Sequence, residues 1–135
     1  MFRTVDHIGF AVRDIEEAIT FYTNMFDVSG WERLAMPERH MAVAITHVGD
    51  TLLELIAPTS EQASFAKFLQ ERGPCMHHIA YRVDDIAVAL ADASARGIQL
   101  IDAEPRSGMH NTLVAFLHPK STMGVLIELV QYQEH

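Results

Sequence analysis

The sequence predicts an α+β fold in which two paired βαβββ modules form a curved mixed sheet. The first observation is an internal repeat, because the segment His7–Ile15 returns as His78–Ile86. The second is the order of the apolar patterns, which show the period of a strand, then of a helix, then of three strands in each half. The third is the length of 135 residues, which corresponds to one domain with a sizeable core.

Each copy of the repeat is expected to begin with a strand and to continue as a helix. The apolar residues after each strand follow the i, i+3, i+4, i+7 spacing of a helix with one buried face. Asp14 followed by Glu17 is typical of an N-cap with its capping-box partner, and Gly97 is typical of the residue that ends a helix.

The later part of each half shows apolar or alternating segments separated by turn residues, which is typical of strands. Gly49-Asp50 is a two-residue connection of the hairpin type, so the segments on either side of it are expected to pair. The expected strands are residues 31–36, 41–48 and 51–57 in the first half and residues 98–100, 112–117 and 124–132 in the second.

A helix is expected between the halves, with Thr59 and Gln62 as a capping box and Gly73-Pro74 as its end. One module has an apolar sheet face that it cannot bury alone, so the two halves are expected to form one cooperative domain. The expected organisation is a single domain over residues 1–135, with internal modules 3–58 and 75–132 joined by a linker helix over residues 59–73.

Composition excludes several classes of protein. The formal net charge of −8 opposes binding to the phosphates of nucleic acids. No apolar run has the length of a membrane span, and the N-terminal residues lack the pattern of a signal peptide. The single Cys75 excludes an internal disulfide framework and indicates a reducing compartment. We therefore expect a cytoplasmic protein with no nucleic-acid or membrane partner.

Four polar residues lie where strands otherwise carry apolar side chains. Glu54 and Glu128 are each flanked by apolar residues on their own strand face, and an unpaired buried carboxylate costs roughly several kcal/mol. His7 and His78 lie inside apolar strands and are equivalent under the repeat, as are the two glutamates. Taken singly, each residue is typical of a strand edge or a satisfied core position. A two-fold arrangement of the modules would instead bring all four to one axis.

Two imidazoles and two carboxylates form a neutral complex with a divalent cation, which removes the cost of burial. The predicted metal ligands are His7, Glu54, His78 and Glu128. The set contains no thiolate and is compatible with Co, Zn, Ni, Mn or Fe. Four protein ligands could close a tetrahedral structural zinc site, whereas a metal with five or six ligands keeps positions for a substrate oxygen. Proton abstraction next to a carbonyl suits such a site, because the cation stabilises an enolate oxygen and a carboxylate moves the proton.

At these residues the chain resembles the vicinal oxygen chelate superfamily, and within it the methylmalonyl-CoA epimerases. The resemblance extends from Val5 to Tyr132. The segments that carry it are Asp6–Val12, Met36–Glu38, Glu54–Pro58, His77–Ala80, Val83–Ile86, Glu104–Arg106, Ala115–Thr122 and Gly124–Leu129. The resemblance implies a glyoxalase-like fold around one divalent metal ion, held by the same four predicted ligands.

The activity implied by the resemblance is the interconversion of the two epimers of methylmalonyl-CoA, or of a related 2-substituted acyl-CoA thioester. The implied reaction is a 1,1-proton transfer through a metal-stabilised enolate, with Glu128 as the base. Some members have a second glutamate where this chain has Val43, so Glu54 is the candidate for the second acid or base.

The resemblance also indicates where the CoA part of the substrate would bind. The residues expected near its anionic tail are Arg39, Arg106, Lys120 and Ser121. Family members often have glycine where this chain has His40 and Met123, and each larger side chain adds bulk where backbone or cofactor approaches closely.

Two other functions fit the same residues. A glyoxalase I-like isomerase, of the lactoylglutathione lyase type, uses the same His and Glu set, and a bleomycin-resistance-type binding protein has the same fold without a catalytic metal. An extradiol dioxygenase is disfavoured, because a second glutamate ligand would block a position that its iron keeps open. Exposed sheet edges favour a homodimer for each of these functions.

Overall fold

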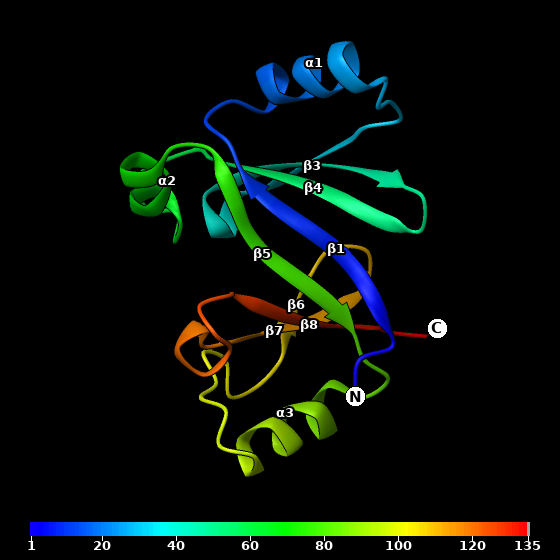
Figure 1. Cartoon of the computed structure of the whole chain (residues 1–135), viewed down its shortest axis with the longest axis vertical. Coiled ribbons are helices and arrows are strands. Elements are labelled where there is room, and N and C mark those ends of the chain that lie inside the picture. The colour runs from blue at the N-terminus through cyan, green and yellow to red at the C-terminus, as the bar shows by residue number, and fades with distance from the viewer. Residues whose placement is uncertain (135) are drawn as a thin grey trace. The chain divides into compact units, whose positions relative to one another are not determined.

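The computed structural model of the chain describes residues 1–134, and its elements follow the predicted order (Figure 1). The first half contains β1 (Thr4–Ala11), α1 (Ile15–Phe26), β2 (Glu32–Met36), the 3-10 turn η1 (Pro37–Arg39), β3 (Met41–Val48), β4 (Thr51–Pro58) and α2 (Ala66–Arg72). The second half contains β5 (Cys75–Arg82), α3 (Ile86–Ala95), β6 (Arg106–Ser107), β7 (Thr112–Leu117), the 3-10 turn η2 (Pro119–Ser121) and β8 (Ile127–Tyr132). The predicted α+β fold is confirmed.

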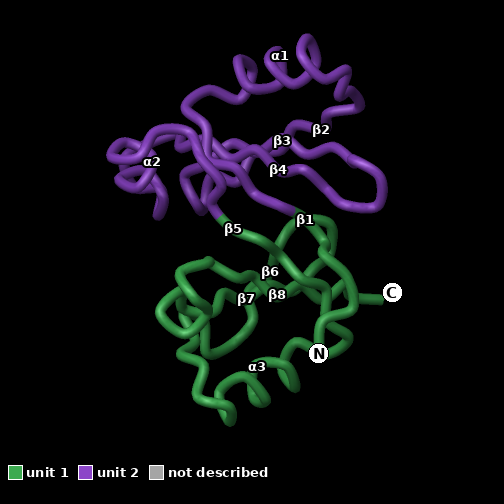
Figure 2. Tube along the Cα trace, viewed as in Figure 1, with its two compact units in different colours: residues 1–7, 78–135 green, residues 8–77 purple. Residues whose placement is uncertain are grey.

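The chain forms two compact units, which Figure 2 shows in different colours. Unit 1 contains residues 1–7 and the chain from His78 onward, and unit 2 contains Ile8–His77. Both boundaries fall inside strands, so β1 and β5 each contribute residues to both units. The organisation as one domain with two modules and a linker helix stays a prediction.

In unit 2 the strands are ordered β2-β3-β4-β1, and the β2–β3 and β3–β4 pairs are antiparallel. The hairpin at Gly49-Asp50 is confirmed, because Val48 pairs with Thr51 across it. Helix α1 covers one face of this sheet, where its Ile19 packs with Ala44 and Leu55.

The start of α1 follows from its N-cap. The Asp14 carboxylate accepts a hydrogen bond from the backbone N–H of Glu17 at 2.9 Å, as the capping pattern predicts. Such a cap satisfies one of the N–H groups that the first turn leaves without a helical partner. Asp85 caps α3 in the same way, by accepting from the N–H of Val88 at 3.1 Å.

In unit 1, β5 pairs with β8 in parallel, and β7 pairs antiparallel with both β8 and β6. Helix α3 covers one face of this sheet, where Leu90 belongs to the same buried cluster as Leu129. Successive side chains of a strand point to opposite faces, so Glu128 points away from α3. Ala80 pairs with Glu128 in the β5–β8 register, which places His78 on the same face as Glu128.

Three segments differ from their predictions, and one of them is β6, a strand at Arg106–Ser107 where none was expected. The helix expected over residues 59–73 is observed only as α2, which begins at Ala66. The Ser60 hydroxyl accepts a hydrogen bond from the N–H of Gln62 at 3.1 Å, and such a local bond competes with a helical turn. The strand expected over residues 98–100 is reduced to one bridge between Leu100 and Leu117.

The structure gives a backbone reason for glycine at two positions where the resemblance expects it. His40 has a φ of 56° and Met123 has a φ of 61°, both in the left-handed region. A side chain with a Cβ atom enters this region at a cost of about 1–2 kcal/mol, which glycine avoids. The two positions therefore demand backbone freedom, independently of any bulk near a cofactor.

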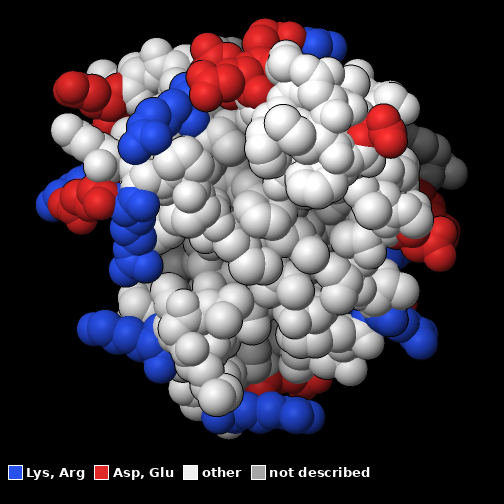
Figure 3. Space-filling view, turned by 45° about the horizontal axis from the view of Figure 1, so that its top comes forward, with Lys and Arg blue, Asp and Glu red and all other residues white. Residues whose placement is uncertain are grey.

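The helices in the described part of the chain are all too short or too polar to cross a membrane. On the face that Figure 3 draws, charged side chains of both signs lie mainly towards the margin. Two exposed ion pairs join Arg33 to Glu16 at 2.7 Å and Arg3 to Asp84 at 2.6 Å. Pairs of this kind reduce the number of cations that remain for an anionic ligand.

Candidate metal centre

Three of the four predicted ligands meet inside unit 1. His7 lies on β1, His78 on β5 and Glu128 on β8, and each is at most 7% exposed. The Nε2 atoms of the two histidines are 3.1 Å apart. The Glu128 Oε1 atom lies 3.0 Å from His7 Nε2 and 3.2 Å from His78 Nε2. These three side chains therefore lie together, and their role as metal ligands stays a prediction.

The donor atoms of this cluster fit a divalent cation. On a cation with bonds of ~2.1 Å, adjacent ligand atoms lie ~3.0 Å apart at right angles and ~3.4 Å apart at tetrahedral angles. The measured separations of 3.0 to 3.2 Å fall between these values and closer to the first. The donor atoms are therefore close enough together to share one divalent cation.

The environment keeps Glu128 ionised. Burial raises the pKa of the Glu128 carboxyl, but the hydrogen bonds with His7 and His78 and the charges of both imidazoles together lower that pKa well below its usual range. Both contacts use Oε1, so neither imidazole occupies Oε2. An ionised carboxylate is the form that binds a metal and the form that accepts a proton.

Two further residues surround His7, and neither was predicted from the sequence. The Asp6 Oδ2 atom lies 2.7 Å from His7 Nδ1, and the Tyr132 hydroxyl donates to Asp6 Oδ1 at 2.7 Å. Burial, this hydrogen bond and the charge of Asp6 raise the pKa of Tyr132 above its usual range. Asp6 directly precedes a predicted ligand in the sequence, which could have identified it. No sequence pattern marks Tyr132.

The fourth predicted ligand, Glu54, belongs to unit 2. It lies on β4 opposite Ile45 of β3 and is 6% exposed. Strand alternation places Val43 and Ile56 on the same face as Glu54. The position that carries a second glutamate in some family members is therefore a buried valine beside Glu54, and the role of Glu54 as a ligand stays a prediction.

The residues expected at the CoA tail lie in both units. Lys120 is on η2 in unit 1, is exposed, and has no carboxylate partner within residues 1–134. Ser121 accepts a hydrogen bond through Oγ from the N–H of Gln99 at 2.9 Å, which ties η2 to the chain before β6. Arg39 is half-buried on η1 in unit 2.

The loop at η2 uses its own backbone donors. The Lys120 N–H donates to His118 Nδ1 at 3.1 Å, and the N–H groups of Ser121 and Thr122 donate to backbone carbonyls. An anion at this loop would therefore depend on the Lys120 ammonium rather than on backbone N–H groups. The third cation, Arg106, is engaged, because its guanidinium lies 3.1 Å from the Asp102 carboxylate.

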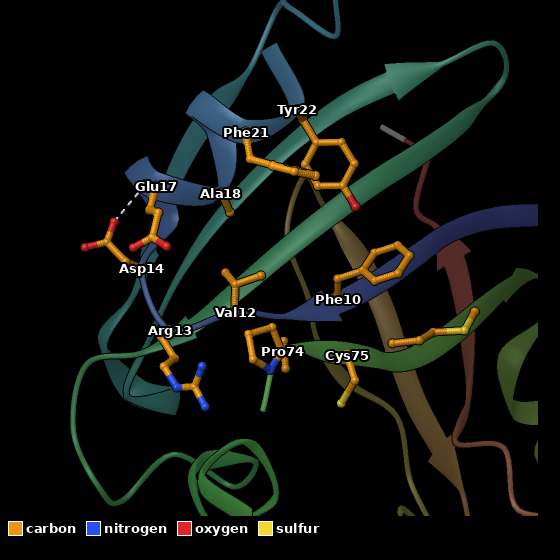
Figure 4. Close-up of a pocket in the computed structure, with 12 residues that line it drawn as sticks. Phe10, Val12, Arg13, Asp14, Glu17, Ala18, Phe21, Tyr22, Pro74 and Cys75 are labelled. Carbon is orange, nitrogen blue, oxygen red and sulfur yellow. Dashed lines mark hydrogen bonds between the residues drawn. The ribbon is translucent and has the colours of Figure 1, made fainter. Parts of the chain in front are cut away.

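Unit 2 also contains an open groove of about 450 Å³, shown in Figure 4. It lies along α1, β1 and the start of β5, and it contains none of the predicted site residues. Its lining is mostly apolar, with Phe10, Val12 and Tyr22 around the opening and Arg13 and Cys75 at one end.

The sequence matches the Glyoxalase/Bleomycin resistance protein/Dioxygenase superfamily over residues 6–116. It is 37% identical to the mitochondrial methylmalonyl-CoA epimerase of Homo sapiens, over 94% of this chain and 73% of that protein. It is 36% identical to the ethylmalonyl-CoA/methylmalonyl-CoA epimerase of Cereibacter sphaeroides, over 97% of this chain and 99% of that protein.

A solved structure extends this likeness to three dimensions. A methylmalonyl-CoA epimerase in complex with methylmalonyl-CoA and NH4+ superposes with a TM-score of 0.91 at 30% identity, over 98% of this chain and 96% of that one. With the family match and the buried His and Glu cluster, these relatives show that the chain belongs to the glyoxalase/bleomycin resistance protein/dioxygenase superfamily, as an isomerase like the methylmalonyl-CoA epimerases.

Proposed function

We propose that this chain epimerises methylmalonyl-CoA, or a related 2-substituted acyl-CoA thioester, in a reaction that depends on one divalent metal ion. The observation that carries the proposal is the buried cluster of His7, His78 and Glu128, whose donor atoms lie 3.0 to 3.2 Å apart. Relatives named for this reaction, over nearly the whole chain, support the choice of substrate.

His7, His78 and Glu128 would hold the ion, with Glu54 as the fourth protein ligand. When bound, a divalent ion supplies electrostatic stabilisation for the negative charge that develops on the thioester oxygen as C2 loses its proton. The metal is one of Co, Zn, Ni, Mn and Fe, all of which accept imidazole and carboxylate ligands.

Glu128 is the proposed base, and Oε2 is the atom that would take the C2 proton, since both imidazoles contact Oε1. Glu54 is the proposed acid that returns a proton on the opposite face of C2. The apolar Val43 beside Glu54 has no proton to give. Of the two titratable groups on this face of β3 and β4, Glu54 is buried and His47 is exposed, so Glu54 is the proposed acid.

Only a few positively charged side chains are proposed to bind the anionic tail of CoA. Lys120 is the proposed main contact, because its ammonium is exposed and without a carboxylate partner in the described chain. Arg39 is proposed as the second cation and Ser121 as a hydroxyl contact at the same loop as Lys120.

We further propose that the protein is a cytoplasmic homodimer. The support for the dimer is an exposed edge strand, β2, in unit 2 and three exposed apolar residues on α1, namely Phe21, Met25 and Phe26. Light scattering coupled to size exclusion measures this directly, and a monomer at micromolar concentration would contradict it.

The deciding experiment measures metal content and C2 exchange on one preparation. Protein purified without chelator is expected to contain one divalent ion per chain and to exchange the C2 hydrogen of methylmalonyl-CoA with solvent deuterium. Turnover of a methylglyoxal–glutathione hemithioacetal without C2 exchange would instead identify a glyoxalase I-like isomerase. Absence of both a stoichiometric ion and any turnover would identify a binding protein.

A further inference from the structure

We propose that Asp6 and Tyr132 are positioning residues for the metal centre, because they fix the ring and the tautomer of His7. This inference rests on the proposed metal dependence. By holding His7 in place, the two residues would strengthen binding of the ion. The bound ion would in turn raise the rate of proton transfer.

The geometry of Asp6 sets which nitrogen of His7 carries hydrogen. A carboxylate accepts only, so the 2.7 Å contact between Asp6 Oδ2 and His7 Nδ1 requires Nδ1 to be the donor. His7 Nε2 faces His78 Nε2 and Glu128 Oε1, and without an ion it would donate to Glu128; an ion that displaces this hydrogen would bind the electron pair of Nε2 while Nδ1–H stays on Asp6. A carboxylate on the far nitrogen of a metal-binding histidine fixes its orientation and raises its basicity.

Tyr132 in turn fixes Asp6. Its hydroxyl donates to Asp6 Oδ1 at 2.7 Å, so the two oxygens of this carboxylate have separate partners. The Asp6 side chain is only 10% exposed, which leaves little water to replace either bond. The guanidinium of Arg82 lies 4.7 Å from the centre of the Tyr132 ring, which restricts the ring in turn.

A carboxylate directly before the histidine is found in the first copy of the repeat and not in the second. The residue that precedes His78 is His77, not an acid, and the His77 ring lies against Phe65 and Phe68 with centroids 5.5 and 5.8 Å away. A role for Asp6 as generic strand packing would predict a similar residue in both copies. The difference points to a specific task for Asp6 at His7.

The test is metal affinity of the variants Asp6→Ala, Asp6→Asn and Tyr132→Phe, measured by competition of Co²⁺ or Zn²⁺ with a chromophoric chelator. Asp6→Ala is expected to raise the Kd about 10–100-fold. Asp6→Asn keeps an acceptor oxygen and is expected to raise it less. Tyr132→Phe removes one hydrogen bond and is expected to raise it about 3–10-fold.

Matched controls come from the same unit. Asp84→Asn removes an exposed carboxylate that pairs with Arg3, and Tyr81→Phe removes the hydroxyl from a ring that stacks on Phe2 at 4.0 Å. Both controls are expected to keep the Kd of the unchanged protein. If Asp6→Ala and Tyr132→Phe also keep it, the proposal is wrong.

A second readout needs no activity. Long-range ¹H–¹⁵N spectra of the Zn²⁺-loaded protein are expected to show hydrogen on Nδ1 of His7 and none on Nε2, with faster solvent exchange of that Nδ1 hydrogen in Asp6→Ala. A His7 ring with hydrogen on Nε2 in the loaded, unchanged protein would overturn the proposal. These measurements stand even if C2 exchange is never found, so failure of the proposed reaction and failure of this inference are distinguishable.

Kinetics supply a third readout where exchange is present. The variants are expected to lower kcat while KM for the thioester stays within about twofold, because neither residue is placed at the CoA tail. A rise in KM with unchanged kcat would contradict a positioning role at the metal.

Discussion

The two histidines that the repeat makes equivalent have different neighbours. His7 has a carboxylate 2.7 Å from its Nδ1 atom, held by the Tyr132 hydroxyl. His78 has the edge of Phe116 beside its ring, with centroids 5.8 Å apart. The repeat thus provides two equivalent histidine positions, one with a carboxylate beside its ring and the other with an aromatic neighbour.

The two helices that follow these strands also differ. Helix α3 buries four residues, Ile86, Ala89, Leu90 and Ala93, against its sheet. Helix α1 buries Ile19 alone and leaves Phe21, Met25 and Phe26 at least 51% exposed. Although the repeat makes α1 and α3 equivalent, α3 buries apolar residues in the core of unit 1, whereas α1 leaves apolar side chains exposed.

The largest expected effect is on the rate of C2 exchange, and it distinguishes the proposed roles of Glu128 and Glu54. Glu128→Gln removes the proposed base and is expected to lower the rate of C2 exchange roughly 10²–10⁴-fold. Glu54→Gln keeps an amide oxygen as a ligand, so it is expected to retain the metal while losing the proposed acid function. Metal content and C2 deuterium exchange of both variants, with circular dichroism as the control for folding, measure the difference. Full exchange activity in Glu128→Gln would rule out its assignment as the base.

The second largest effect is on the free energy of unfolding, and it distinguishes the buried helix α3 from the more exposed helix α1. Leu90→Ala opens a cavity in the buried cluster of unit 1 and is expected to lower the free energy of unfolding by about 2–5 kcal/mol. Phe26→Ser removes an exposed ring and is expected to change that free energy by no more than about 0.5 kcal/mol. Urea denaturation measures both. A large loss of stability in Phe26→Ser, at a concentration where the protein is monomeric, would show that α1 is packed more tightly than its exposure indicates.

The third effect is the stabilisation by a bound metal ion, which is expected to differ between unit 1 and unit 2. A divalent ion at a free concentration of 100 times its Kd is expected to add about 2.7 kcal/mol to the free energy of unfolding, which a chelator removes. Three of the proposed ligands belong to unit 1, so hydrogen exchange on metal removal is expected to rise most in β8 and in the parts of β1 and β5 that belong to this unit. Equal changes throughout β2 and β3 would contradict that distribution.

What the sequence could predict depended on periodicity. His7, His78 and Glu128 were identifiable because each interrupts an apolar strand at a position that the repeat matches. Tyr132 was not identifiable, because it binds Asp6 across 126 positions of sequence and no repeat or spacing connects them. The linker helix was predicted too long, since a capping-box pattern does not reveal that the Ser60 hydroxyl binds a nearby backbone N–H instead.

The smallest expected effect concerns two of the residues with left-handed backbone, His40 in unit 2 and Met123 in unit 1. Met123 is 97% exposed with a φ of 61°, so its side chain gains little from packing while its backbone is strained. Met123→Gly is expected to raise the free energy of unfolding by about 0.5–1 kcal/mol, since relief of strain exceeds the added entropy of the unfolded chain. His40, at a φ of 56°, is half-buried, and His40→Gly loses packing that Met123→Gly does not. Thermal unfolding of both variants compares the two positions: a larger gain for His40→Gly would mean that strain, not side-chain contact, dominates at both.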